Sequence, residues 1–268
     1  MRLKKIETFS DYAALVENFK RRGTLTNDYI QLKVAEDIAH GSLFYSCKGE
    51  NAFVFVTKDG FHRLYYYLND LSVPVDFLTG QFVTEILFRT EIIGISREIE
   101  YLKSCGFEEN LVRDQYFAKY SSIISTPQPE GLRIDTARSL GEVQWAVDLF
   151  NSSFDKWSGD YISRDLCALL LNEQTVLTCK DKEGILLGAC QVESQRGIHW
   201  LRHLAVTGEA RRKGVGTALL NAYIVNGHHD DESRYMLWVQ RNNYAAVDMY
   251  KKKGFSYLGK SSLSMIKL

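Results

Sequence analysis

The feature that most constrains this chain is a short basic loop with two glycines, placed between an apolar run and a helix-forming run. The loop spans residues 211–216, the apolar run 199–206 precedes it, and the run 217–225 follows it. A strand that leads through such a loop into a helix directs backbone N–H groups and the positive helix end at one point. Gly214 and Gly216 have no Cβ to keep a ligand from the backbone. The order predicts a phosphate-binding site.

A second pattern follows the next apolar run, 235–240, on a predicted helix that ends in Gly-Phe. Together the two patterns resemble the GNAT acetyltransferase superfamily, whose acetyl-CoA motif is Q/R-x-x-G-x-G/A and whose next motif is N-x-x-A-x-x-x-Y-x-x-x-G-F. The resemblance covers about residues 132–268. The matching positions are Arg211, Gly214, Gly216, Asn243, Ala246, Tyr250, Gly254 and Phe255.

Composition narrows the class of protein. The 268 residues fit one large or two ordinary domains, and Lys+Arg and Asp+Glu are equal at 33 each, so the net charge is zero. Zero charge argues against a nucleic-acid partner, and no apolar run is long enough to span a membrane. The five cysteines are scattered without C-x-x-C spacing, which is typical of buried free thiols in a reducing cytosol. We therefore expect a cytoplasmic protein with no nucleic-acid or membrane partner.

One Ser/Thr/Pro/Gly-rich stretch, 121–131, is predicted to be a linker between an N-terminal domain, 1–120, and a C-terminal domain, 132–268. The C-terminal domain is expected to be a mixed, mostly antiparallel sheet flanked by helices, as the resemblance implies. Periodicity predicts strands at 132–137, 175–180, 184–193, 198–206 and 235–240, helices at 140–154, 164–171, 217–225 and 244–253, and a final strand pair within 255–268.

The N-terminal half shows a similar succession of helix-like and strand-like runs. This similarity predicts a second, degenerate GNAT-like domain in tandem. Its helix at 96–103 is followed by Gly106-Phe107, just as the last predicted helix of the C-terminal half is followed by Gly254-Phe255. It lacks the glycine loop, and Leu102 stands where the second motif has tyrosine. A different mixed α/β domain is the alternative. The other elements expected are a helix at 9–20 and strands at 42–47, 52–58, 61–68, 84–89 and 115–120.

The resemblance implies transfer of an acetyl group from acetyl-CoA, as cosubstrate, to an amine of a small molecule or peptide, with no metal. It implies that the loop amides hold the pyrophosphate, and that the pantetheine arm lies along residues 204–206 where the flanking strands splay apart. A backbone amide there would polarise the thioester carbonyl. The expected acetyl-CoA contacts are Leu204, Ala205, Val206, Arg211, Arg212, Lys213, Gly214, Val215, Gly216, Thr217, Asn243, Ala246 and Tyr250.

Position in the second motif makes Tyr250 the candidate general acid for the departing thiolate, with a core aromatic as the alternative. Asn243 is expected to contact the pantetheine arm or to cap the following helix. His203 and Glu193 are both candidates for the general base. Strand alternation predicts that the neighbours of His203, Trp200 and Arg202, face the other side.

The polar run His228-His229-Asp230-Asp231 follows a predicted helix and is expected to be a solvated loop rather than a metal site. Two other functions fit the same motifs: a non-enzymatic CoA-binding or interaction module, and a transferase that uses another acyl donor on the same fold. The intact glycine loop favours CoA over other carriers, and the tyrosine of the second motif favours catalysis over simple binding.

Overall fold

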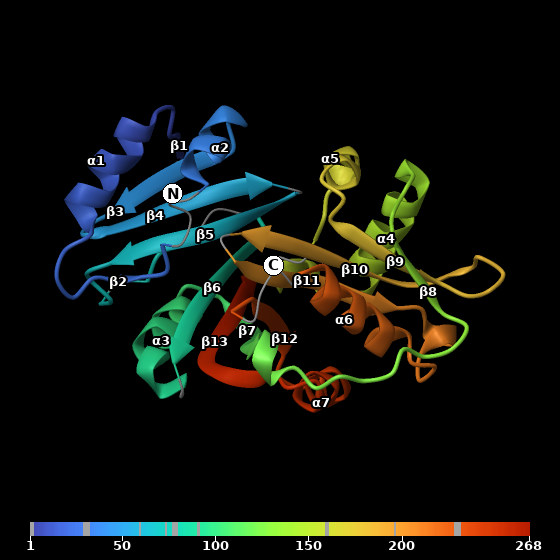
Figure 1. The fold of residues 1–268 in the computed structure, drawn as a ribbon. Coiled ribbons are helices and arrows are strands. Elements are labelled where there is room, and N and C mark those ends of the chain that lie inside the picture. Colours follow the sequence, from blue (N-terminus) through green and yellow to red (C-terminus); the bar gives the residue numbers. More distant parts are fainter. Residues whose placement is uncertain are drawn as a thin grey trace. The chain divides into compact units, whose positions relative to one another are not determined.

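A computed structural model describes residues 3–28, 33–58, 60–72, 74–76, 80–89, 92–158, 161–195, 197–227 and 232–268 (Figure 1). The chain divides into two compact units. Unit 1 comprises Met1–Val112 with Ser261–Leu268, and unit 2 comprises Arg113–Lys260. Both are mixed α/β structures in which most neighbouring strands are antiparallel.

Unit 2 has strands in the order β7-β12-β11-β10-β9-β8. All neighbouring strands with a register in this unit are antiparallel except β11 and β12, which are parallel. Its elements are β8 (Arg133–Thr136), α4 (Leu140–Ser153), α5 (Cys167–Asn172), β9 (Val176–Lys180), β10 (Leu186–Gln195), β11 (Ile198–Val206), α6 (Val215–Asn226), β12 (Arg234–Gln240) and α7 (Tyr244–Lys252). The predicted elements of this half are therefore confirmed, except at its C-terminal end.

Helices cover both faces of this sheet. Adjacent residues of a strand point to opposite sides, and here both sides carry apolar side chains that need covering. On β10, Ala189 packs in one core cluster with Val143 and Phe150 of α4. Its neighbour Cys190 packs in another cluster with Leu219 of α6. The apolar face of α4, spaced at helical intervals, is thus buried on one side of the sheet and α6 on the other.

Unit 1 repeats the central arrangement of unit 2, with strands in the order β1-β3-β4-β5-β6-β13. As with β10, β11 and β12, the pair β4 and β5 is antiparallel and the pair β5 and β6 is parallel. Its elements are β1 (Lys4–Lys5), α1 (Phe9–Phe19), β2 (Leu25–Thr26), α2 (Val34–Ala39), β3 (Leu43–Lys48), β4 (Asn51–Lys58), β5 (Phe61–Leu68), β6 (Phe82–Arg89) and α3 (Ser96–Ser104). The repeat predicted from the sequence is therefore present.

The division between the units differs from the predicted domains. It lies within β7 (Glu108–Lys119), whose later part pairs with β12. The predicted linker belongs to unit 2, because Ile124 N–H donates to the Lys253 carbonyl and Thr126 exchanges hydrogen bonds with Asn221 of α6. Strand pairing between distant segments, which local composition does not report, sets this division.

The predicted final strand pair is instead one strand, β13 (Ser256–Lys267), and this expectation was wrong. Gly259, at φ +74, lies within this strand. The end of β13 contributes Leu263 and Met265 to the core of unit 1. A glycine in a strand marks a local irregularity, and the chain continues through it without a hairpin turn.

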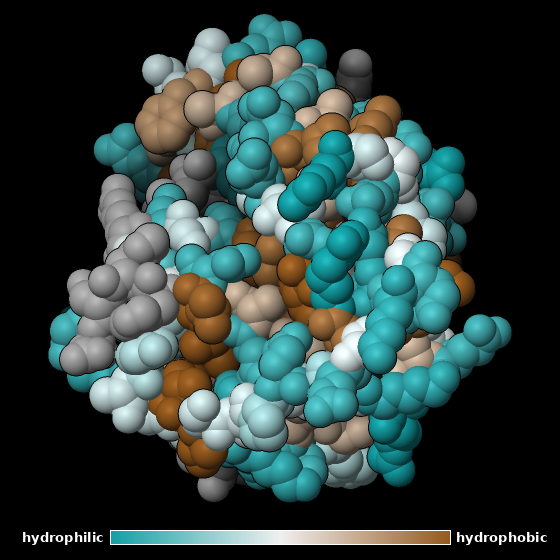
Figure 2. All heavy atoms as spheres, turned by 45° about the vertical axis from the view of Figure 1, so that its right-hand side comes forward, coloured by the Kyte–Doolittle hydropathy of each residue, from teal (hydrophilic) through white to brown (hydrophobic). Residues whose placement is uncertain are grey.

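All five cysteines are free; four are buried and Cys47 is exposed. The prediction of buried free thiols therefore holds for four of the five, and Cys47 is the exception. Within the described ranges, no helix is both long and apolar enough to cross a membrane. On the face shown in Figure 2, hydrophilic side chains predominate and hydrophobic ones form smaller groups between them.

Candidate active site

The two parallel strands of unit 2 part in the middle of the sheet. The ladder between β11 and β12 runs from Ile198↔Arg234 to Leu201↔Leu237 and ends there. Beyond it, β11 stays paired with β10 as far as Val206, while β12 stays paired with β7 as far as Gln240. The β12-facing edge of residues 204–206 therefore has backbone groups that no neighbouring strand pairs within the described residues. An extended ligand can pair with this edge as an added strand does.

A β-bulge lies beside the point where the strands part. In the β10–β11 register, Gln191 pairs with His203 but Val192 pairs with Leu201, so Arg202 is an extra residue in β11. A bulge of this kind reverses which face the following side chains occupy. Accordingly Leu201 and Leu204 both pack in the cluster that contains α6, although they are three positions apart.

The bulge corrects one prediction from strand alternation. Glu193 pairs directly with Trp200, and Gln191 pairs directly with His203. Directly opposed residues share a face, as do alternate residues of one strand, so Trp200 lies on the same face as His203. The prediction that Trp200 and Arg202 face away from His203 was wrong, because alternation is broken at Arg202.

The glycine loop leads into α6 as predicted. Gly214 is the N-cap, in a left-handed conformation with φ +82, and no side chain caps the helix. The first helical bond is from Ala218 N–H to the Gly214 carbonyl. The N–H groups of residues 215–217 therefore lack helical partners and point beyond the helix end. Arg211, Arg212 and Lys213 are exposed beside them, so this end of α6 is suited to an anion.

Packing around the two loop glycines differs, and it shows contacts that the sequence did not reveal. A Cβ on Gly214 would lie 2.8 Å from Cγ of Pro129, so protein atoms already fill that position. A Cβ on Gly216 would lie 3.3 Å from Sδ of Met249 on α7, with Leu204 and Val206 each 3.9 Å away. The missing Cβ of Gly216 therefore faces the region between α6, α7 and the parted edge of β11.

The second motif forms α7, and its residues meet the same core. Tyr250 is 7% exposed and packs in the cluster that contains α6 and β11. Burial, and secondarily the nearby Cys190, raises the pKa of the Tyr250 phenol, so it is protonated at neutral pH. Asn243 is the N-cap of α7, where its side chain accepts from Ala246 N–H at 3.3 Å. The capping interpretation of Asn243 is thus confirmed.

His203 is enclosed on the face that α4 covers. Its ring stacks on Phe150, with centroids 5.1 Å apart, and meets Phe154 edge-on at 5.4 Å. Its Nδ1 lies 2.8 Å from Oε1 of Gln191, the residue that pairs with it across the strands. The side chain is 8% exposed, so its orientation is set by protein contacts rather than by solvent.

Glu193, the other candidate base, is held by the bulge residue. Nε of Arg202 donates to its carboxylate at 2.6 Å, and both side chains are partly exposed. The Arg202 guanidinium also lies 4.9 Å from the centroid of the Trp200 ring. The structure therefore brings both candidate bases to one face but gives them different partners, an amide for His203 and a guanidinium for Glu193.

The predicted loop His228-His229-Asp230-Asp231 lies outside the described residues. Elsewhere in the described chain, no group of three or more His, Cys, Asp or Glu side chains is arranged to hold a metal ion.

Three further residues emerged only from the structure: Gln191, Pro129 and Met249. Each meets its partner across a distance in sequence that no local motif spans.

The equivalent gap in unit 1 is filled by the chain itself. The parallel ladder of β5 and β6 ends at Leu64↔Thr84, and β2 then takes the free edge of β5. The next residue, Asn27, is 1% exposed and bonds to both parted strands. Its Nδ2 donates to the Leu64 and Glu85 carbonyls at 3.2 and 3.0 Å, and its Oδ1 accepts from Tyr66 N–H at 2.9 Å.

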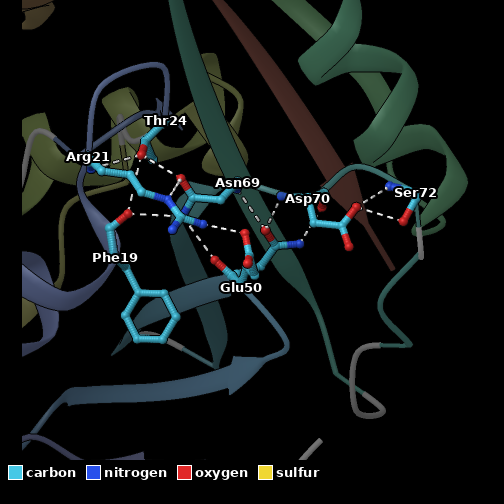
Figure 3. A network of polar contacts seen from close by, with 8 residues as sticks. Phe19, Arg21, Thr24, Glu50, Asn69, Asp70 and Ser72 are labelled. Atoms are coloured by element: carbon cyan, nitrogen blue, oxygen red, sulfur yellow. Dashed lines mark hydrogen bonds and ion pairs between the residues drawn. The ribbon is translucent and has the colours of Figure 1, made fainter.

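The segment that fills this gap is fixed at both ends. Before it, Thr24 donates to Asn69 Oδ1 at 2.6 Å, and Asn69 Nδ2 donates to the Phe19 carbonyl at 2.9 Å (Figure 3). At its C-terminal end, the Asp28 carboxylate accepts from the hydroxyls of Tyr12 and Tyr67. We call residues 25–28 the plug segment. It occupies in unit 1 the place that is open in unit 2.

Comparison with known proteins shows which family and which solved structures this chain resembles. Residues 143–255 match the model of the acetyltransferase (GNAT) family. A GCN5-related N-acetyltransferase from Sphaerobacter thermophilus aligns with a TM-score of 0.59 and 12% identity, over 81% of this chain and 76% of that chain. A GNAT-family acetyltransferase from Colwellia psychrerythraea aligns over 100% of both chains, with a TM-score of 0.52 and 14% identity.

A tandem GNAT protein from the clavulanic acid biosynthesis pathway aligns over 84% of this chain and 81% of its own, with a TM-score of 0.52 and 11% identity. No curated protein matches this chain. At these identities the likeness to solved structures establishes the fold, and it confirms the predicted GNAT fold with two GNAT-like domains.

Proposed function

We propose that this chain, whose residues 143–255 match the GNAT acetyltransferase family, is an acetyl-CoA-dependent N-acetyltransferase whose acceptor is a primary amine of a small molecule or peptide. The observation that carries the proposal is the open edge of β11 beyond Leu201↔Leu237, next to the uncapped N-terminus of α6. An unpaired strand edge leading to an anion site matches a ligand with an extended amide-bearing arm and a pyrophosphate.

In this proposal the cofactor contacts are divided by chemistry. The N–H groups at the start of α6 and the side chains of Arg211, Arg212 and Lys213 hold the pyrophosphate. The backbone of Leu204, Ala205 and Val206 pairs with the pantetheine arm, and an N–H of this edge polarises the thioester carbonyl. Val215, Gly216, Thr217, Asn243 and Ala246 line the path between the two. Acetyl-CoA supplies an acyl group activated as a thioester.

The protein must also move protons. When the amine nitrogen bonds to the carbonyl carbon and the C–S bond breaks, the thiolate gains a proton and the amine loses one. Tyr250 is the proton donor to sulfur, since burial keeps its phenol protonated. The proton acceptor is on the face shared by His203 and Glu193, where the bulge places both.

We propose one cofactor site per chain. The plug segment already pairs with β5 and bonds to β6, so unit 1 has no open edge equivalent to residues 204–206. Leu102 of α3, at the position corresponding to Tyr250, is fully buried and carries no proton donor. We also place the protein in the cytoplasm, without nucleic-acid or membrane partners, because its cysteines are free and its net charge is zero.

Titration calorimetry with acetyl-CoA tests the proposal, followed by a thiol-release assay with amines that include polyamines, amino acids, amino sugars and a mixed peptide pool. We expect one acetyl-CoA per chain and amine-dependent CoA release. Binding without release on any amine would favour the alternative of a CoA-binding module. Release with longer acyl-CoA but not with acetyl-CoA would favour another acyl donor.

A further inference from the structure

We propose that residues 126–129, which we call the strap, position the glycine loop for the cofactor, and that Lys253 at the end of α7 is the positioning residue that fixes the strap. This inference rests on the proposed function, because it takes the start of α6 to be the pyrophosphate site. It adds a link between that site and α7, the helix that carries Tyr250. One end of the strap contacts Lys253 and the other end contacts Gly214.

The first residue of the strap, Thr126, joins α6 to the end of α7. Lys253 Nζ donates to Thr126 Oγ1 at 2.9 Å, and the same hydroxyl donates to Oδ1 of Asn221 at 3.1 Å. An ammonium can only donate, so the hydroxyl hydrogen must point to Asn221. Nδ2 of Asn221 then donates to the Thr126 carbonyl at 3.3 Å, and Ile124 N–H donates to the Lys253 carbonyl at 3.1 Å. Both helices therefore hold this end of the strap.

From Asn221 the strap runs back along α6 to the glycine loop. Pro129 contacts Gly214, the N-cap, where an added Cβ would come within 2.8 Å of the proline Cγ. Gly214 and Asn221 are almost two full turns apart, so they lie on one face of the helix and are separated by about 10 Å along its axis. The chain from Thr126 to Pro129 can span about 10 Å only when it is extended. The strap therefore has little slack between its two contacts.

The composition of the strap makes it stiff. Pro127 and Pro129 are two of the three prolines in the chain, and the ring of each fixes its φ. Thr126 and Gln128 each precede a proline, which favours extended backbone at both positions. A segment of this composition behaves as a semi-rigid spacer. A displacement of one end is therefore transmitted to the other end rather than absorbed between them.

The burial of Lys253 indicates that its role is positional. The residue is 5% exposed, and among the described residues it forms no ion pair. Burial lowers the pKa of its ammonium. A charge taken out of water with a single hydroxyl partner contributes less stability than an apolar side chain of similar length would. Lys253→Met should therefore leave the free energy of unfolding unchanged or raise it, while it releases the strap.

Titration calorimetry with acetyl-CoA on the full-length protein, together with urea denaturation, tests this link. A contact can pass on no more free energy than it contributes, and a hydrogen bond is worth about 2- to 10-fold in an equilibrium constant. We expect Lys253→Met to lower acetyl-CoA affinity by about 2- to 10-fold without loss of stability. Thr126→Val should lower affinity by at least as much, and Thr126→Ser, which keeps the hydroxyl, should bind as the wild type does.

Asn151 of α4 provides a matched control, because it holds a loop of the same unit as Asn221 holds the strap. Its Nδ2 donates to the Ile162 carbonyl at 2.9 Å, and its Oδ1 accepts from the Ile162 N–H at 3.0 Å. Asn151→Ala removes these bonds without touching α6 or α7. It should therefore lower stability and leave acetyl-CoA affinity unchanged.

Amide hydrogen exchange in the absence of ligand measures the start of α6 directly. Ala218 N–H makes the first helical bond of α6, to the Gly214 carbonyl. We expect its exchange to be about 2- to 10-fold faster in Lys253→Met than in the wild type, and unchanged in Asn151→Ala.

The proposal is overturned if Lys253→Met binds acetyl-CoA as the wild type does, or if its affinity falls only in step with its stability. Unchanged exchange of Ala218 in Lys253→Met, or an equal loss of affinity in Asn151→Ala, would overturn it as well. Absence of acetyl-CoA binding in the wild type would instead overturn the proposed function, and the exchange measurement would still test whether the strap holds the glycine loop.

Discussion

Pro129 lies against the N-cap of α6, where a Cβ on Gly214 would come within 2.8 Å of the proline Cγ. Gly214 also has φ +82, a conformation that costs other residues about 1–3 kcal/mol. The glycine is therefore demanded by the protein itself, before any ligand binds. The segment predicted to be a linker therefore packs, through Pro129, against the predicted phosphate loop.

Gly214→Ala should thus lower the free energy of unfolding by about 1–3 kcal/mol in the absence of acetyl-CoA, as measured by urea denaturation. Pro129→Ala in the same background should recover the part due to the clash, but not the part due to the backbone conformation. Unchanged stability of Gly214→Ala, with acetyl-CoA binding abolished, would show that the ligand rather than Pro129 requires the glycine.

Gly216→Val should act mainly on the cofactor. Its side chain would press on Met249 and lie close to Leu204 and Val206, beside the open edge of β11. We expect acetyl-CoA affinity to fall by at least about tenfold, which is about 1.4 kcal/mol, in titration calorimetry. Ala222, partly buried on the same helix, gives a control in Ala222→Val. Equal loss of affinity in both variants would point to a general disturbance of α6.

Tyr250→Phe should lower kcat by about 100-fold, the low end for general acid–base catalysis, because a thiolate is easily protonated. Acetyl-CoA affinity should stay near that of the wild type, since only the hydroxyl is removed. The assay is CoA release at saturating acetyl-CoA, with Tyr223→Phe as a control for loss of another buried hydroxyl. If kcat does not change, Tyr250 is a core aromatic and sulfur leaves unassisted.

The same residue gives a pH-dependent stability. Burial raises the pKa of Tyr250 above its ordinary value near 10, so the folded state keeps a proton that the unfolded state loses. Stability from this group is complete below pH 10 and declines as the pH rises above it. Urea midpoints at pH 8 and pH 10.5 should therefore differ less in Tyr250→Phe than in the wild type. An identical pH dependence would mean that the phenol is not protected.

Because the plug segment closes the gap in unit 1, we expect one acetyl-CoA per chain. We also expect Asn27 to contribute strongly to stability. Asn27→Leu removes three hydrogen bonds of this buried side chain, those to the Leu64 and Glu85 carbonyls and that from the Tyr66 N–H. Each lost hydrogen bond costs about 0.5–1.5 kcal/mol, so unit 1 should unfold at clearly lower urea. Asn243→Ala, which removes a helix cap in unit 2, should cost only about 1 kcal/mol. A stoichiometry of two in the wild type would contradict the plug.

Much of unit 2 could be predicted because its signals are local. The strand, loop and helix around Gly214 and the capped helix after Asn243 each depend on residues within a few positions of one another. Hydrophobic periodicity and motif spacing report such local order directly. The repeat in unit 1 was visible for the same reason, through the helix that ends at Gly106.

The tertiary structure decided what distant segments do to one another. The sequence carried no sign that Arg202 is a bulge, so alternation misplaced Trp200, and none that Gln191 would face His203. Nor did it show that Asn27 would close one gap while the other stays open. Local motifs fix which elements form, because backbone conformation depends on near neighbours. Strand register and side-chain packing fix which residues meet, because they depend on pairs far apart in the chain.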